Sequence, residues 1–100
     1  MEYDLKDKWI DALEGEYALK KGQDSLAFEG KFCCLGVLQM VTQGYVEPIR
    51  DSYGDAEEEM PTYEYLDKVG LSRSDAMFLA YLNDESEDFT NVIKHIQENI

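Results

Sequence analysis

The segment KFCCLGVL at residues 31–38 constrains the fold more than any other stretch, because its periodicity changes within a few residues. From residue 34 onward the apolar positions share one helical stripe, which consists of Cys34, Leu35, Leu38 and Val41. Gly36 inside this helix costs about 1 kcal/mol relative to alanine, so its presence predicts that another element approaches the helix backbone closely. The sequence therefore predicts a strand that turns directly into a buried helix, which ends before Gly44.

The residues before this helix have the pattern of a two-stranded hairpin at about residues 25–33. Residues 25–28 and 31–33 read as the strands, and Gly30 supplies the positive φ that a tight turn requires. An isolated hairpin is marginally stable, so we expect it to pack on helices.

Further helices are expected over residues 5–14, 63–69, about 72–82 and 89–100. Asp4 is the expected N-cap of the first helix and Trp9 its buried anchor, whereas Gly70 ends the helix at 63–69 and Ser72 caps the next one. The predicted fold is α+β and mainly α-helical, with four to five short helices packed with one β-hairpin at about residues 25–33.

The chain of 100 residues, 44% of them apolar, predicts a single globular domain over residues 1–100 with one modest core. A surface loop is expected at 45–61, where Pro48, Gly54 and Pro61 surround the acidic run at 55–59. No run reaches the roughly 20 apolar residues that cross a bilayer, and the N-terminus lacks the pattern of a signal peptide. We therefore expect a soluble, cytoplasmic protein.

The two cysteines are adjacent, which disfavours both a disulfide and a zinc site. Neighbouring residues do not reach normal disulfide geometry, and zinc ligands are usually spaced apart with further ligands elsewhere. A catalytic pair would need Cys33 or Cys34 close to His95, the one histidine. Cys34 shares the apolar stripe, so a core position is favoured instead, and we expect no catalytic residue, cofactor or metal.

The charge balance is strongly acidic, with 22 Asp and Glu against nine Lys and Arg and a formal net charge of −13. Direct binding to nucleic acid or to an anionic membrane is disfavoured, because both depend on Lys and Arg. The expected partners are basic proteins. The alternative is that the acidity only keeps the protein soluble and monomeric.

Three segments together resemble a family of small uncharacterised proteins encoded by bacteriophages and prophages. They are KWIDALEGEY at residues 8–17, FCCLGVL at residues 32–38, and LNDE at residues 82–85 followed by Phe89 and Ile93. The resemblance implies an accessory protein of the host cytoplasm that binds a host or defence component. The resemblance implies no particular activity and no catalytic residues for this chain.

The leading hypothesis is a binding protein that inhibits a partner with a basic, nucleic-acid-binding surface, and DNA mimicry is one form of it. Its predicted partner-binding residues are Asp51, Tyr53, Asp55, Glu57, Glu58, Glu59, Tyr63, Glu64 and Asp67. The alternatives are a structural or assembly component, either a homo-oligomer or a virion-associated protein, and a small-ligand binder or enzyme. The last would need a pocket lined by groups such as Cys33, Tyr81 and Asn83.

Overall fold

The computed structural model describes residues 1–22, 25–50 and 56–100, and for residues 48–50 and 56–59 it describes the backbone alone. The elements are α1 (Tyr3–Glu14), β1 (Ala27–Phe28), β2 (Lys31–Phe32), α2 (Cys34–Gln43), β3 (Pro48–Arg50), β4 (Ala56–Pro61), α3 (Tyr63–Val69), α4 (Arg73–Glu85) and α5 (Thr90–Asn99). The prediction of a mainly helical α+β fold with a hairpin at about 25–33 is confirmed, since β1 and β2 pair antiparallel there. None of the described helices is both long and apolar enough to cross a membrane.

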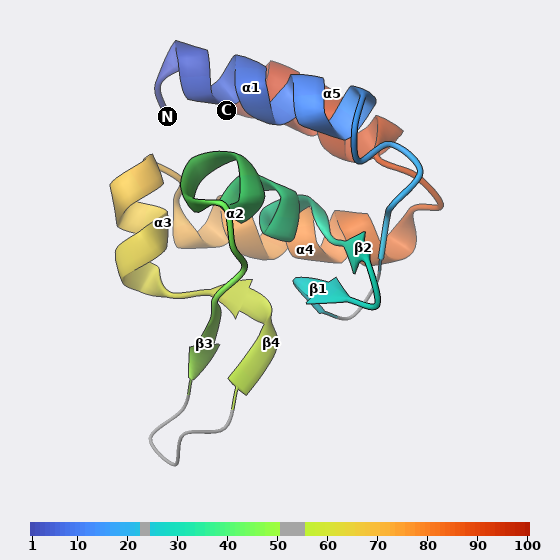
Figure 1. Cartoon of the computed structure of the whole chain (residues 1–100). Helices are drawn as coiled ribbons and strands as arrows, with labels where there is room; N and C mark the ends of the chain where they lie inside the picture. Colours follow the sequence, from blue (N-terminus) through green and yellow to red (C-terminus); the bar gives the residue numbers. More distant parts are fainter. Residues whose placement is uncertain (23–24, 51–55) are drawn as a thin grey trace.

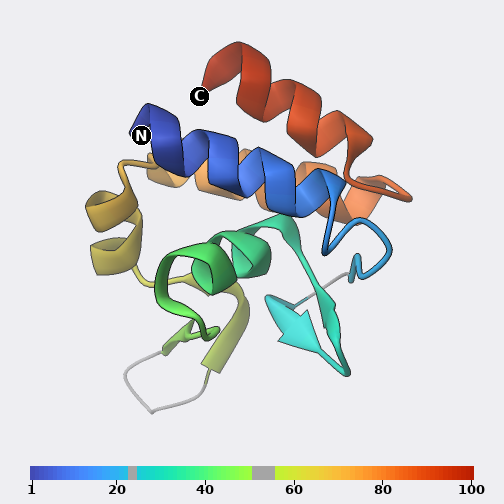
Figure 2. The same cartoon turned by 45° about the horizontal axis from the view of Figure 1, so that its top comes forward.

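The helices form two layers, and the hairpins lie at one side of them. Helices α1 and α5 lie side by side and cover α2 and α4, while the β3–β4 hairpin projects away from α1 and α5 (Figures 1 and 2). The core between the layers includes the fully buried side chains of Trp9, Leu13, Leu35, Leu38, Leu66, Leu79, Val92 and Ile96. Trp9 is thus the buried anchor that the sequence predicts.

A second antiparallel hairpin occupies much of the segment that was expected to be a surface loop. Strands β3 and β4 pair, with a register shift between Pro48 and Ile49, whereas residues 51–55 lie outside the described part of the chain. Pro48 is opposite Pro61, so the two prolines lie at the first position of β3 and the last position of β4. Proline lacks an N–H and is tolerated at such strand ends. The loop prediction was wrong for 48–50 and 56–61 because these prolines mark strand ends.

The helix ends follow the predicted signals at most positions. Gly44 and Gly70 are left-handed residues that follow α2 and α3, and the Ser72 hydroxyl accepts a hydrogen bond from the Asp75 N–H at the start of α4. The start of α1 differs, because the helix begins at Tyr3 and its N-cap is Glu2. Asp4 therefore lies in the first turn, where its charge still interacts favourably with the helix dipole.

Cys34 is the point at which the three segments of the sequence resemblance meet. Its backbone oxygen accepts a hydrogen bond from Trp9 Nε1 at 2.9 Å, and its backbone N–H donates to Asn83 Oδ1 at 3.0 Å. The amide of Asn83 also donates to the Gly22 carbonyl oxygen at 2.9 Å. All three side chains are fully buried, so these bonds join α1, α2 and α4 inside the core.

The close approach predicted at Gly36 is made by the backbone of Leu26. A Cβ atom added at Gly36 would overlap the Leu26 carbonyl oxygen and lie 2.9 Å from its carbonyl carbon. Real Cβ atoms do not come that close to backbone atoms. The segment before β1 therefore packs directly on α2, which confirms the prediction.

Candidate functional site

The predicted partner-binding residues fall on β4 and α3, or between β3 and β4. Tyr63, Glu64 and Asp67 belong to α3 and are exposed. The backbone of Glu57, Glu58 and Glu59 lies in β4, while Asp51, Tyr53 and Asp55 lie outside the described residues. Only Thr62 separates β4 from α3, so the acidic residues of these two elements follow one another closely along the chain (Figure 1).

A groove of about 280 Å³ lies next to these residues, between the end of α2, the segment before β3, and α3. Its lining includes Gln43, Tyr45, Glu47, Glu64, Tyr65 and Lys68. Two carboxylates and one ammonium group give the groove a net negative charge, and two tyrosines contribute aromatic surface. The sequence predicted Glu64 here, but not Tyr45 or Glu47.

The wall of this groove is held in place by Gln39, which is a buried residue of α2. The Gln39 amide donates to the Glu47 carbonyl oxygen at 2.7 Å and accepts from the Glu47 N–H at 3.1 Å. Only 1% of the Gln39 side chain is exposed. The backbone of Glu47 is therefore tied to a buried side chain of α2. The one available sequence signal, a polar residue inside the apolar stretch at 34–41, was not used in predicting the site.

Tyr65 forms the inner side of the groove and remains a neutral phenol. Its hydroxyl lies 2.7 Å from Thr42 Oγ1. Burial raises the pKa of Tyr65 to about 12, although the hydrogen bond with Thr42 lowers that pKa in part. The group is thus available for hydrogen bonding and packing but not as a base near neutral pH.

The cysteines have the surroundings of core residues. Burial raises the pKa of the Cys34 thiol well above its usual range, and the charges of Cys33 and Asp84 raise it further. The Cys34 thiol is fully buried and lies 3.6 Å from the Leu79 carbonyl oxygen. A neutral, buried thiol is a poor nucleophile, and the predicted core position of Cys34 is confirmed.

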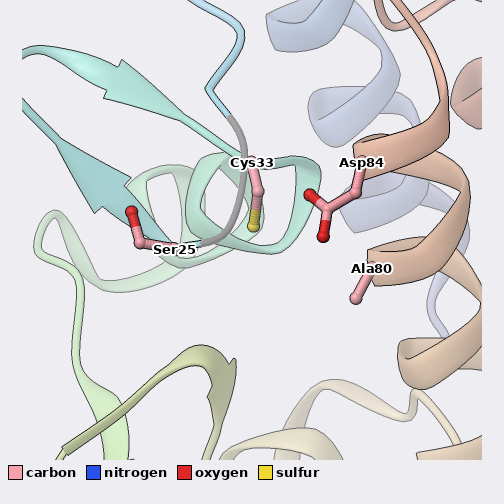
Figure 3. Close-up of a pocket in the computed structure, with 4 residues that line it drawn as sticks. All are labelled: Ser25, Cys33, Ala80 and Asp84. Carbon is pink, nitrogen blue, oxygen red and sulfur yellow. The ribbon is translucent and has the colours of Figure 1, made fainter.

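Cys33 borders a small cavity of about 10 Å³, which it shares with Ser25, Ala80 and Asp84. The Asp84 carboxylate points toward the Cys33 side chain (Figure 3). This volume holds about one water molecule, which is too little for an organic substrate. Tyr81 is 60% exposed and Asn83 accepts a hydrogen bond from the Cys34 N–H, and neither of them lines this cavity beside Cys33.

His95 takes part in contacts between α4 and α5. Its ring lies 4.7 Å from the ring of Phe78, and its Nδ1 lies 3.2 Å from Asn99 Nδ2. The His95 side chain is half-buried. Within residues 1–22, 25–50 and 56–100, no group of three or more His, Cys, Asp or Glu side chains is arranged to hold a metal ion.

A further surface hollow has mixed charge. It measures about 330 Å³ and is lined by Lys21, Gly22, Lys31, Ser86 and Glu87. Lysines would attract an anion, but the carboxylate beside them opposes it. Of these two hollows, the groove between α2 and α3 is the one with a net negative charge, which is also the sign of the whole chain's charge.

Comparison with known proteins adds a similarity over the first part of the chain. Residues 1–47 match the model of a family described as a domain of unknown function (DUF8296). The matched part contains α1, the β1–β2 hairpin and α2, and therefore Trp9 and Cys34 but not Asn83. No curated protein and no solved structure matches the chain.

Proposed function

We propose that this protein acts by binding, and that it inhibits a host or defence protein by covering a basic, nucleic-acid-binding surface. The groove between α2 and α3 carries this proposal, because Glu47 and Glu64 lie there beside Tyr45 and Tyr65 in a chain of net charge −13. The partner-binding residues of this proposal are those predicted from the sequence, which are Asp51, Tyr53, Asp55, Glu57, Glu58, Glu59, Tyr63, Glu64 and Asp67.

The physical basis is complementarity with Lys and Arg side chains. A surface that binds nucleic acid offers closely spaced cations, and carboxylates compete for them in place of phosphates. Long-range attraction by the net negative charge speeds the encounter. Tyrosines suit the contact itself, since tyrosine is enriched in protein interfaces. DNA mimicry is the form of this proposal in which the carboxylates occupy phosphate positions.

The sequence resemblance and the cysteines support the proposed cellular location of the protein. Resemblance to phage-encoded proteins favours a partner in the bacterial host, and we place the protein in the host cytoplasm. Neither Cys33 nor Cys34 forms a disulfide, which agrees with a reducing compartment. The buried Cys34 thiol and the small cavity at Cys33 support a role without catalysis.

The test is capture of partners from host lysate with the intact protein, followed by affinity measurements with the captured protein. Binding is expected to weaken by an order of magnitude or more between about 50 mM and about 300 mM salt, and nucleic acid should displace the protein. Binding that is insensitive to salt and to nucleic acid would contradict the proposal.

A matched pair of variants tests the groove. Glu47→Gln with Glu64→Gln is expected to weaken binding about five-fold or more, because two carboxylates no longer face the partner's cations. Glu14→Gln with Glu98→Gln removes the same charge from exposed positions of α1 and α5. Equal losses in both variants would show that total charge, rather than the groove, decides binding.

Assembly is the second candidate function, and a separate observation favours it. Helix α4 exposes large apolar side chains that no described element covers. This surface is distant in sequence from Glu47 and Glu57–Glu59, so it is considered separately.

A further inference from the structure

Helix α4 carries an exposed apolar patch on the face opposite the core. Met77 is 64% exposed, Tyr81 is 60% exposed and Phe78 is 45% exposed, whereas Ala76, Leu79 and Asn83 on the other face are buried. The Phe78 ring lies 6.4 Å from the Tyr81 ring and 4.7 Å from that of His95. Neighbouring exposed side chains of these types mark interaction surfaces.

Met77 and Tyr81 of this patch belong to a ridge that runs obliquely along α4 and has opposite charges at its ends. Residues four apart on a helix lie on one ridge, and here they are Arg73, Met77, Tyr81 and Glu85. We call these four residues the α4 ridge. Arg73 and Glu85 are both exposed. The Arg73 guanidinium stacks on the Tyr63 ring at 3.8 Å from the ring centre, which orients it and leaves its N–H edge available for a carboxylate.

This order of residues is complementary to itself. When two copies of α4 cross antiparallel about a two-fold axis at the level of Leu79, position 73 of one copy faces position 85 of the other. Position 77 then faces position 81. Arg73 of each copy then faces Glu85 of the other copy, and Met77 faces Tyr81. An interface about a two-fold axis must be self-complementary in this way. We propose that the α4 ridge is the interface of a homodimer.

A second copy fits the ridge better than a basic foreign protein does. A partner rich in Lys and Arg would face Arg73 as well as Glu85, whereas a second copy neutralises both. One helix per copy buries less than the roughly 800 Å² per partner of a stable interface, so the dimer is expected to be weak and reversible. The inference goes beyond the proposed function, because α4 carries none of the predicted partner-binding residues and the dimer does not depend on a basic partner. The α4 ridge adjoins those residues at one point, where Arg73 stacks on Tyr63.

Analytical ultracentrifugation of the intact protein tests the dimer, over about 10 µM to about 1 mM. The wild type is expected to associate with concentration. The dimer should strengthen between about 10 mM and about 150 mM salt, because the Debye length falls from about 30 Å to about 8 Å and repulsion between the two acidic molecules is screened. A protein that stays monomeric across this range would overturn the inference, even if Tyr81→Asp weakened capture of a basic partner.

Substitutions locate the interface. Tyr81→Asp is expected to weaken dimerisation at least ten-fold, while Leu19→Asp, at a residue that is 98% exposed, should leave it unchanged. Equal effects of the two variants would overturn the assignment to α4. Circular dichroism melts establish that each variant is folded.

The charged ends allow a stricter test. Arg73→Glu alone and Glu85→Arg alone are each expected to weaken the dimer several-fold, since each places like charges opposite one another. The double variant restores the opposite charges in reverse order and should recover most of the association. Both single changes also suit the helix dipole, so α4 itself is not weakened. A double variant that associates no better than the single variants would show that the antiparallel pairing is wrong.

Discussion

Tyr65 lines the groove, packs in the core and links α3 to α2 through its hydroxyl group. The side chain is 8% exposed, and its hydroxyl shares a hydrogen bond with Thr42 of α2. Burial favours the neutral phenol and raises its pKa to about 12, compared with a reference value of 10.0. The protonation of this one residue is therefore linked to the stability of the fold.

We expect an alkaline loss of stability that depends on Tyr65. The folded state holds the proton more tightly than the unfolded state, so this contribution is complete below pH 10 and disappears as the pH rises toward about 12. Tyr65→Phe cannot ionise and should lose less stability over that range than the wild type. Urea unfolding at a series of pH values measures the difference.

Tyr3→Phe is the matched control, because Tyr3 is 81% exposed and has no comparable burial. This variant should follow the wild-type pH profile. If Tyr65→Phe shows the same alkaline loss as the wild type, the stability lost there does not come from Tyr65.

At the residue scale, the sequence predicted those features that arise from local pattern. Cys34 lies on an apolar stripe and Gly36 interrupts it, so burial and close approach could both be predicted. The role of Gln39 could not be predicted in this way, because its partner is the backbone of Glu47. No sequence pattern specifies which backbone groups a buried amide will reach. Glu47 was not predicted as a groove residue for this reason.

At the scale of elements, helix α2 begins without a cap from its own flanking side chain. Cys33 occupies the N-cap position and makes no side-chain capping bond there. Asn83 of α4 supplies the acceptor instead, through its bond from the Cys34 N–H. A cap that comes from another helix cannot be recognised in the local sequence, although Asn83 is a polar residue within the apolar part of α4.

Replacing Asn83 by alanine is expected to destabilise the protein by about 2–3 kcal/mol, since it leaves the buried Cys34 N–H and the Gly22 carbonyl oxygen without these partners. The midpoint of urea unfolding measures the loss. Asn99→Ala removes an exposed amide of α5 that binds His95 and should cost less than about 0.5 kcal/mol. Similar losses in both variants would contradict the capping role.

The β3–β4 hairpin shows why one element could not be predicted. Consecutive glutamates have low β-propensity, and prolines at both ends resemble loop signals. Strand β4 is stabilised by its pairing with β3, and this pairing is a contact between segments that the local sequence pattern does not specify. The helices and the first hairpin were predicted because their periodicity and turn residues act locally.

At the scale of the whole molecule, the negative charge opposes the compact state. Twenty-two acids and nine bases share one small domain, so bringing them together raises the repulsion between carboxylates. Salt screens that repulsion. We expect the melting temperature to rise by several degrees between about 10 mM and about 150 mM salt.

Differential scanning calorimetry at low protein concentration, where a weak dimer contributes little, measures this effect. Sodium chloride and potassium chloride should act alike, because screening does not depend on a specific ion. A melting temperature that falls with salt would show that attractive charge pairs outweigh the repulsion.

The bond between Asn83 and Cys34 also bears on where this chain can be divided. The similarity to the DUF8296 model ends at residue 47, whereas the bond joins positions on either side of that limit. A fragment that stopped there would keep the bond between Trp9 and Cys34 but would lose Asn83, Leu79 and Ile96 from the core. The boundary of the sequence match is therefore not a boundary of folding, and expression of the matched segment alone would yield a chain with an open hydrophobic face.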